Sequence, residues 1–256
     1  DITELVTAQR TAAWADVARR IAHEIKNPLT PIQLSAERIK RKYGKVITQD
    51  REVFDQCTDT IVRQVDDIKR MVDEFSSFAR MPKARPGQED LAEIVRQGEF
   101  LQRVGSPKIL FTTDIPATMP AVFDRRLLAQ APTNIFKNAP GGISVQRAEG
   151  RIHVRLAQEN GEARIDVIDN GRGFPVDNRK RLLEPYMTTR AEGTGLGLAI
   201  VNKILEDHGG RIELLDAPDA GLPDAMQNEF PRGAWVRLAF PAAGVPAAPS
   251  EDSRAS

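Results

Sequence analysis

The first eighty residues carry apolar side chains at helical spacing, and this pattern most limits what the chain can fold into. Intervals of three and four residues place each of two sets on a single helix face. The first set consists of Trp14, Val17, Ile21, Ile25, Leu29, Ile32, Ala36 and Ile39. The second set consists of Val53, Cys57, Ile61, Val65, Ile68, Val72, Phe75 and Ala79. The two sets predict two long helices in this part of the chain.

The first predicted helix ends at about Arg41, and Gly44 lies in the break that follows. Thr48 is the predicted N-cap of the second helix and Pro82 its stop. One helical hairpin buries little apolar surface, whereas two hairpins paired in a four-helix bundle cover both seams. We therefore expect a homodimer. Packing of the hairpin onto a second domain is the alternative.

His23 lies roughly opposite the apolar seam of the first helix, at about 100° per residue. The residues that share its polar side are Asp16, Arg19, Asn27 and Thr30. The acidic residue Glu24 adjoins it, and Pro28 is expected to bend the helix just beyond it. An outward histidine of this kind is available for chemistry.

The composition sets limits on the function. A chain of 256 residues is long enough for two domains, and its 36 basic and 36 acidic residues balance. This balance argues against a nucleic-acid binder driven by bulk charge. The single cysteine, Cys57, excludes an intrachain disulfide and suits a reducing compartment, and its place in the apolar pattern predicts packing. No apolar run approaches the ~20 residues that cross a bilayer.

After a polar linker at residues 82–90, the pattern changes from helices alone to a mixture of helix and strand signals. We therefore expect a helical domain over residues 1–81 and a mixed domain over residues 91–240. The predicted helices of the mixed domain are Leu91–Leu101, Asp124–Ala139 and Thr194–His208. The predicted strands are Lys108–Thr113, Arg151–Ala157, Ala163–Asp169, Arg211–Leu215 and Ala234–Phe240. Asn160-Gly161 predicts a hairpin, and Gly209-Gly210 a helix stop. The pattern predicts an α+β sandwich, with residues 241–256 as a disordered tail.

Three motifs in the mixed domain point to a ligand. Asp169-Asn170-Gly171-Arg172-Gly173 follows a strand, where a carboxylate can accept from an exocyclic amine and glycines allow close approach. Gly193-Thr194-Gly195-Leu196-Gly197-Leu198 precedes a helix, where backbone N–H groups suit phosphates. Asn134 and Asn138 share a helix face beside Lys137, and amide oxygens suit Mg²⁺.

Each motif alone has a plainer interpretation: an acidic turn, a glycine-rich turn, or two solvated asparagines. The three in this order strengthen one another. The remaining histidines, His153 in mid-strand and His208 at a helix end, are expected to be structural.

The motifs H-E-x-K-N-P-L-T-P, N-x-x-x-N-A, D-N-G-R-G and G-T-G-L-G-L occur in this order between about Ala13 and Phe240. With this combination of motifs, the chain resembles the catalytic core of a sensor histidine kinase. Among the branches of that family, it is most similar to the NtrY-type nitrogen-regulatory kinases. The resemblance implies a dimerisation and histidine-phosphotransfer domain followed by an ATP-binding domain of the Bergerat type. The chain begins at Asp1 rather than at a methionine, so we expect an excised fragment. The expected location is a cytoplasmic fragment of a full-length protein anchored in the inner membrane through upstream segments.

The resemblance also implies residue roles. His23 would accept the phosphoryl group of ATP, Glu24 would orient the imidazole and accept its proton, and Asn27 would place water in a phosphatase reaction. Asn138 would hold Mg²⁺ and Asp169 would take the adenine amine. The other nucleotide-binding residues would be Asn134, Lys137, Gly171, Gly173, Tyr186, Arg190, Gly193, Thr194, Gly195, Leu196 and Gly197. The segment 174–192 would be a mobile lid, and a response-regulator receiver domain would be the partner.

Two features depart from the family pattern. Pro132 lies inside the predicted helix 124–139, where an interior proline costs about 3 kcal/mol. Pro140-Gly141-Gly142 follows directly after Asn138-Ala139. Together they are expected to end the helix early and misplace Asn138. The alternative function is therefore a kinase-impaired dimeric module that binds or dephosphorylates a regulator.

Overall fold

The computed structural model describes residues 2–142, 150–175, 177, 179–188 and 194–244 of the chain. The chain divides into two compact units. The helical unit contains Asp1–Pro82 with Thr188–Leu196, and the mixed unit contains Lys83–Met187 with Gly197–Ser256. In the described part of the chain, no helix has both the length and the apolar character needed to cross a membrane.

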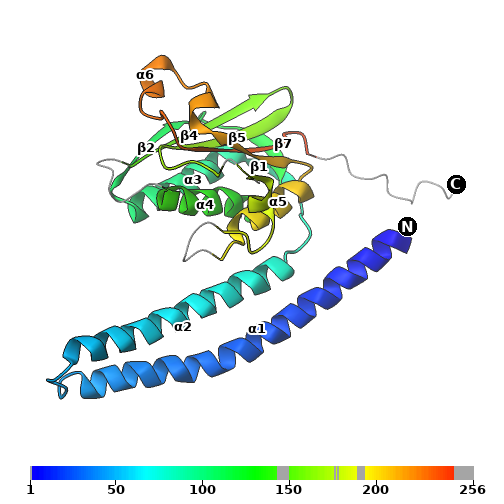
Figure 1. Ribbon diagram of the computed structural model, residues 1–256. Coiled ribbons are helices and arrows are strands. Elements are labelled where there is room, and N and C mark those ends of the chain that lie inside the picture. The colour runs from blue at the N-terminus through cyan, green and yellow to red at the C-terminus, as the bar shows by residue number, and fades with distance from the viewer. Residues whose placement is uncertain (1, 143–149, 176, 178, 189–193, 245–256) are drawn as a thin grey trace. The chain divides into compact units, whose positions relative to one another are not determined.

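The helical unit is a hairpin of two long helices, α1 (Ile2–Tyr43) and α2 (Arg51–Ala79), which run side by side in Figure 1. Both predicted helices are confirmed. The predicted N-cap is wrong: α2 begins after Asp50, which adopts a left-handed conformation at φ 54° and makes no side-chain cap bond. Its backbone carbonyl accepts the Phe54 N–H at 3.1 Å, so Thr48 lies in the turn before the helix.

The two helices contact each other through residues spaced by seven. Ala22, Leu29 and Ala36 of α1 are buried, and so are Val65, Val72 and Ala79 of α2. A seven-residue interval keeps one seam facing a partner helix along its whole length, as in coiled coils. Ion pairs Lys26–Asp73 and Lys40–Asp59 join the helices outside this seam. Only some residues of the predicted apolar face of α1 are therefore buried within the hairpin.

A second stripe on each helix stays exposed in the single chain. Ile25, Ile32 and Ile39 of α1 are 38–47% exposed, and Ile61 and Ile68 of α2 are 44% and 38% exposed. These residues also recur every seven positions, next to the buried seam. Cys57, which we expected to pack, is exposed as well. Each helix of the hairpin thus has one apolar seam buried against the other helix and a second apolar stripe that is exposed in the single chain.

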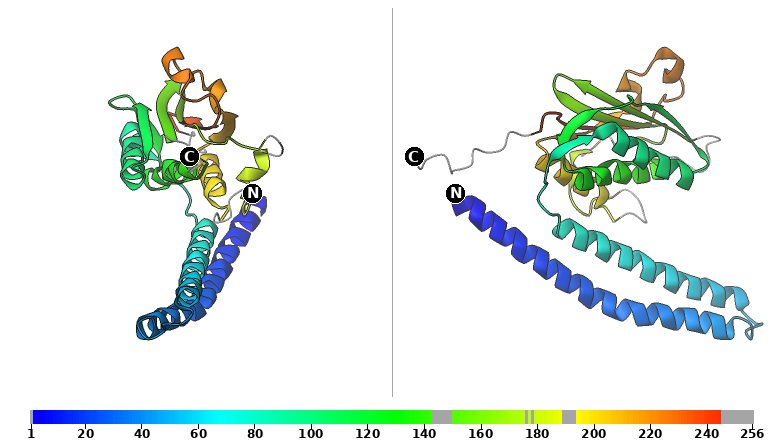
Figure 2. Two further views of the ribbon diagram at one scale, coloured as in Figure 1. Left: turned by 60° about the vertical axis from the view of Figure 1, so that its left-hand side comes forward. Right: turned by 180° about the vertical axis from the view of Figure 1, so that it is seen from behind.

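The mixed unit contains a five-stranded sheet in the order β2-β4-β5-β7-β6. The strands are β2 (Ile109–Asp114), β4 (Gly150–Glu159), β5 (Glu162–Asp169), β6 (Arg211–Asp216) and β7 (Ala234–Pro241). β2 pairs with β4 in parallel, and the other pairs are antiparallel. Three helices cover one face of the sheet (Figure 2), namely α3 (Leu91–Gly105), α4 (Arg125–Gly142) and α5 (Gly197–Asp207). The predicted α+β fold is confirmed.

Local turn chemistry explains where two elements end. Asn160 and Gly161 join β4 to β5 with φ angles of 51° and 81°, the positive values that a two-residue hairpin turn needs. Gly209, at φ 69°, ends α5, and the Gly210 N–H then donates to the Leu205 carbonyl at 2.7 Å. This is the bond of a helix stop with a left-handed glycine. Both turns were predicted correctly.

Several boundaries differ from the prediction. Residues 87–90, expected in the linker, form β1 (Gly87–Asp90), which pairs with an unpredicted strand β3 (Pro120–Phe123). The helix expected from Thr194 begins at Gly197. Residues 241–244 are not a disordered tail. The Ala242 carbonyl accepts the Val122 N–H, and the Ala242 N–H donates to the Gly161 carbonyl, both at 2.9 Å. The rest of the expected tail, residues 245–256, lies outside the described residues.

The other face of the sheet carries a row of alternating charges. Cross-strand pairing aligns Asp114, Arg155, Asp166, Arg237 and Glu213, one residue from each of the five strands. The connection from β6 to β7 contains the 3-10 helix η2 (Ala217–Ala220) and the helix α6 (Asp224–Gln227). Its apolar side chains form a small core with the sheet: Ile168, Ala217, Ala220, Leu222, Phe230 and Trp235.

Candidate active site

His23 lies on α1 with its side chain exposed, as predicted, and Glu24 and Asn27 lie beside it on the same helix. Pro28 and Pro31 lie inside the same continuous helix, further along from His23. Neither has an N–H group, so the carbonyls of Glu24 and Asn27 lose their helical donors. α1 is curved rather than straight in Figures 1 and 2, as prolines inside a helix cause.

The second group of candidate residues lies on α4. Asn134 and Asn138 are one helical turn apart and half-buried, and Lys137 is exposed. Asn134 Nδ2 is one of two buried side-chain polar atoms in the described residues that lack a hydrogen-bond partner. A Cβ added at Gly197, the first residue of α5, would lie 3.3 Å from Asn138 Nδ2. The start of α5 therefore lies close to the end of α4, and the absence of a side chain at Gly197 leaves space for Asn138.

The loop after β5 is held by its own polar side chains. Asp169 Oδ1 accepts the N–H groups of Gly171 at 2.8 Å and Ala234 at 3.3 Å. Asn170 Oδ1 accepts the Arg151 N–H at 2.9 Å, and the Asn170 N–H donates back to the Arg151 carbonyl at 3.2 Å. Asp169 and Asn170 thus fasten the loop to β7 and β4, and this fixes the carboxylate.

Two glycines allow the backbone to pack against this loop. Gly173 has φ 78°, and a Cβ there would lie 3.2 Å from the Gly233 carbonyl oxygen. Gly233 has φ 140°, and a Cβ there would lie 1.8 Å from the Asp169 carbonyl oxygen. Only glycine fits at position 233, because both its backbone angle and its surroundings exclude a side chain.

The glycine-rich segment leads directly into α5. Gly195 has φ 70°, and the Leu196 N–H donates to Thr194 Oγ1 at 3.3 Å. The Leu196 side chain is buried, so only its backbone is available to a ligand. α5 starts at Gly197, and the N–H groups of its first turn have no acceptor within the helix. Gly193 and Arg190 lie outside the described residues.

The expected lid, residues 174–192, is anchored in its first half. The short 3-10 helix η1 (Arg179–Leu183) begins with Arg179, whose guanidinium donates to both carboxylate oxygens of Asp216 at 2.8 Å. The same guanidinium lies 5.9 Å from the centre of the Phe174 ring. One guanidinium nitrogen thus bonds both carboxylate oxygens and joins η1 to the end of β6, and the mobility expected of this segment stays a prediction. Residues 176, 178 and 189–193 lie outside the described part.

Tyr186 follows η1 and has a φ of 68°. Its side chain is exposed, and partial desolvation raises the pKa of its hydroxyl. A strained, exposed aromatic residue is suited to contact a ligand.

The two other histidines are buried and structural, as predicted. His153 Nδ1 lies 3.0 Å from Thr112 Oγ1 on the neighbouring strand, and burial lowers the pKa of its imidazole. His208 Nε2 accepts the Asp124 N–H at 3.0 Å, while its Nδ1 lies 2.7 Å from the Ile204 carbonyl oxygen and donates to it.

The expectation that α4 ends early is wrong. The helix continues through Pro132 and Pro140 to Gly142. Pro132 is buried where α4 meets α3, 3.8 Å from the position of a Cβ added at Gly98. Asn134 and Asn138 therefore remain on one continuous helix.

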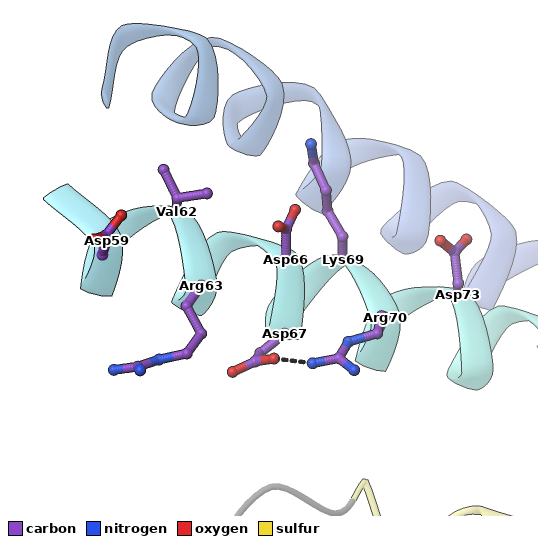
Figure 3. A pocket seen from close by; sticks show the side chains of 8 residues that line it. All are labelled: Asp59, Val62, Arg63, Asp66, Asp67, Lys69, Arg70 and Asp73. Carbon is purple, nitrogen blue, oxygen red and sulfur yellow. Dashed lines mark hydrogen bonds and ion pairs between the residues drawn. The ribbon is translucent and has the colours of Figure 1, made fainter. Parts of the chain in front are cut away.

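A hollow in the helical unit is lined by residues of α2 alone (Figure 3). Its lining is charged apart from Val62, and Figure 3 shows Asp67 paired with Arg70. The residues that line it are Asp59, Val62, Arg63, Asp66, Asp67, Lys69, Arg70 and Asp73. No predicted site residue lines this hollow.

Comparison with known families identifies two domains in the chain. Residues 13–83 match the His Kinase A (phospho-acceptor) domain. Residues 123–244 match the histidine kinase-, DNA gyrase B- and HSP90-like ATPase domain. The chain belongs to the histidine kinases.

The relatives point to one branch of these kinases. The kinase core is 61% identical, over 99% of its length, to the nitrogen regulation protein NtrY of Azorhizobium caulinodans. It covers 32% of that protein, so it spans about a third of the length of its relative. The predicted NtrY-type branch is confirmed.

Solved structures share the fold. The mycobacterial sensor histidine kinase MprB superposes with a TM-score of 0.52 at 26% identity, covering 63% of this chain and 99% of that one. The histidine kinase ThkA, in complex with the response regulator protein TrrA, superposes with a TM-score of 0.59 at 22% identity. That match covers 92% of this chain and 64% of the other.

Sequence reasoning missed residues that contact or support the candidate site residues of this kinase. Gly233 and the Ala234 N–H hold Asp169 from a distant part of the chain. Arg-Gly-Ala before a strand is too common a pattern to reveal that contact. Asp124 is a different case, because an aspartate directly before a helix is a recognisable N-cap signal and could have been found.

Proposed function

We propose that this chain is the catalytic core of a two-component sensor kinase that phosphorylates His23 from Mg-ATP and passes the phosphoryl group to an aspartate of a response regulator. The observation that carries the proposal is the joint presence of an exposed histidine beside an acid on α1 and a nucleotide-type site in the mixed unit.

In the proposed reaction, a ring nitrogen of His23 attacks the γ-phosphorus of ATP. An N–P bond forms, the bond between γ-phosphorus and the bridging oxygen breaks, and ADP leaves. The displaced imidazole proton passes to Glu24, the adjacent carboxylate. Asn27 lies one helical turn further on and would place a water molecule when the phosphoryl group of the regulator is hydrolysed instead.

The residues of the mixed unit fit a nucleotide. Asp169 would accept the adenine amine, and its bonds from Gly171 and Ala234 keep its carboxylate oriented. The first turn of α5, at Gly197, would receive phosphate oxygens on its N–H groups. Asn134 Nδ2, buried without a partner, would gain an acceptor from the nucleotide.

A magnesium ion would supply charge neutralisation for the phosphates, and Asn138 is the residue proposed to hold it. In the described part of the chain, no group of three or more His, Cys, Asp or Glu side chains could hold a metal ion. The remaining ligands would therefore come from phosphate oxygens and water, as is usual for magnesium in nucleotide sites.

We propose a homodimer because the second apolar stripe of the hairpin is exposed in the single chain. Ile25, Ile32 and Ile61 belong to this stripe, and pairing two hairpins would bury it in a four-helix bundle. The solved complex of ThkA with the response regulator protein TrrA supports a regulator as the second partner.

The test is incubation of the chain with γ-labelled ATP and magnesium, followed by measurement of acid-labile, base-stable label. We expect label on the wild-type chain and none on His23→Gln. The Arg19→Gln variant, on the same polar side of α1, should keep its label. Label that survives His23→Gln would show that another residue is the acceptor.

The kinase-impaired alternative rested on an early end of α4. Because α4 continues to Gly142, the geometric argument for that alternative is removed. Calorimetry with a non-hydrolysable ATP analogue separates the two functions: tight magnesium-dependent binding supports the kinase, and no binding supports the regulator-binding module.

A further inference from the structure

The helices α4 and α5 lie close together at one end and are joined by a hydrogen bond at the other. At one end, Gly197 at the start of α5 lies against Asn138 near the end of α4. At the other end, His208 after α5 contacts Asp124 before α4. The nucleotide residues occupy only the first end, so the second end has no assigned role.

The contact at the second end is specific and buried. His208 is 3% exposed and Asp124 is 6% exposed. The neutral imidazole accepts the Asp124 N–H through Nε2 at 3.0 Å and donates through Nδ1 to the Ile204 carbonyl at 2.7 Å. Because both ring nitrogens are used, the imidazole joins the last turn of α5 to the start of α4 in one orientation.

Asp124 extends this contact in two further directions. Its Oδ1 accepts the N–H groups of Arg126 at 3.0 Å and Leu127 at 3.1 Å, which caps α4. Its Oδ2 accepts the Arg85 N–H at 2.9 Å. Burial raises the pKa of this carboxyl group, but the three backbone donors outweigh burial and hold it below the usual value. Residues 83–90, the connecting segment, carry the chain into the mixed unit, so this segment is bound to the same carboxylate that caps α4.

We propose that Asp124 and His208 are positioning residues of the nucleotide site, which set α4 against α5 and join both helices to the connecting segment at Arg85. The proposal rests on nucleotide binding at Asn138 and Gly197. From Asp124 to Asn138 the rise of α4 is about 21 Å at 1.5 Å per residue. α4 is one continuous helix over this span despite Pro132, so a displacement of its start is carried to its end. A shift at Arg85 or His208 therefore changes the spacing between Asn138 and Gly197.

Two substitutions of His208 separate this role from local helix capping. His208→Gln offers a distal amide oxygen where Nε2 was, so it can still accept the Asp124 N–H. His208→Asn keeps a donor for the Ile204 carbonyl but is too short to reach Asp124. We expect His208→Asn to bind an ATP analogue on the order of ten-fold more weakly, the upper range for one lost hydrogen bond. His208→Gln keeps the bond to Asp124, so we expect it to remain within about three-fold of wild type.

Arg85 offers a matched pair at the connecting segment. Arg85→Pro removes the N–H that Asp124 accepts, and the following Pro86 already favours the extended backbone that proline adopts. Arg85→Ala keeps the N–H and removes an exposed side chain. Weaker nucleotide binding by Arg85→Pro than by Arg85→Ala is the expected result, and equal affinities would overturn the link to the connecting segment.

A nucleotide-free measurement keeps the two proposals separate. In ¹⁵N spectra of the full chain, the Asn138 side-chain amide should shift in His208→Asn and stay in place in His208→Gln. Both variants should also melt within a few degrees of each other. An unshifted Asn138 amide in His208→Asn, or the same shift in both variants, overturns the positioning role. Absence of nucleotide binding by the wild-type chain contradicts the proposed function instead, and the spectra still decide this inference.

Discussion

Replacing Asp166 by alanine tests whether the charged row across the sheet stabilises the mixed unit. Asp166 is 2% exposed. Its carboxylate accepts from Arg155 at 2.9 Å, Arg237 at 2.8 Å and the Trp235 indole N–H at 2.9 Å. Burial raises the pKa of Asp166, but the hydrogen bonds from Arg237, Trp235 and Arg155 outweigh burial and lower it. The carboxylate is therefore ionised and fully paired.

The size of the effect follows from what the alanine would leave behind. Removing one partner of a buried ion pair costs about 3–5 kcal/mol, mainly because the other charge stays unpaired. The side chains of Arg155 and Arg237 are 22% and 19% exposed, so water can reach them in part. We therefore expect the low end, about 3 kcal/mol, which lowers Tm by roughly 6–12 °C in a domain of about 150 residues.

Urea unfolding followed by Trp235 fluorescence measures this cost. The chain has two tryptophans, so the measurement uses a Trp14→Phe background. Glu159→Ala is the control, because Glu159 pairs with Arg164 while 58% exposed. Such surface pairs contribute less than about 1 kcal/mol. If Asp166→Ala costs no more than Glu159→Ala, the argument from buried charge is refuted.

The pH dependence gives a second check. The pKa of Asp166 is lower in the folded chain than in the unfolded chain. Its contribution is therefore complete above the unfolded value of about 4 and is lost as the pH falls through the lower folded value. The difference in stability between wild type and Asp166→Ala should be constant near neutral pH and shrink in acid. A difference that grows in acid would contradict the sign of the shift.

Three further changes have expected outcomes. Gly233→Ala places a Cβ 1.8 Å from the Asp169 carbonyl oxygen, so calorimetry should show nucleotide binding at least about ten-fold weaker, whereas Gly87→Ala, with no atom within 4 Å, should bind normally. Ile68→Glu puts a charge in the exposed apolar stripe of α2 and should shift sedimentation toward a monomer. Arg70→Glu, on the charged side of α2, should not. Equal sedimentation of both variants would contradict the dimer surface. Asp216→Ala removes the bidentate partner of Arg179, so trypsin should cut within η1 several-fold faster than in wild type; unchanged cleavage would show that η1 is held by other contacts.

The helices and the central sheet were predictable because their signals are local. A spacing of three and four residues, an Asn-Gly turn and a Gly-Gly stop each depend on neighbouring residues. β1 and β3 were missed because four-residue strands, Gly87–Asp90 and Pro120–Phe123, carry too little alternation to detect. They form because the two segments are brought together in space, which no local pattern records.

The candidate site divides in the same way. His23, Asn138 and Asp169 belong to short motifs, and the sequence indicates them directly. The residues that orient them come from elsewhere: Ala234 is 65 positions from Asp169, and His208 is 84 positions from Asp124. Contacts at such distances depend on the fold, so a single sequence cannot reveal them.

Pro132 shows why an argument from propensity alone gave the wrong end for α4. The cost of about 3 kcal/mol describes a proline in an isolated helix interior. In this chain, Asp124 caps the helix and Arg125 pairs with Glu93 at 2.7 Å, so the start of α4 is fixed from two sides. Further on, Pro132 and Phe136 are buried against Gly98, where even an added Cβ would approach the Phe136 ring to 3.2 Å. Tertiary packing of this kind supplies most helical stability in proteins. The helix therefore carries Asn138 past the proline, and the placement of this candidate site residue depends on the α3–α4 contact as well as on its own motif.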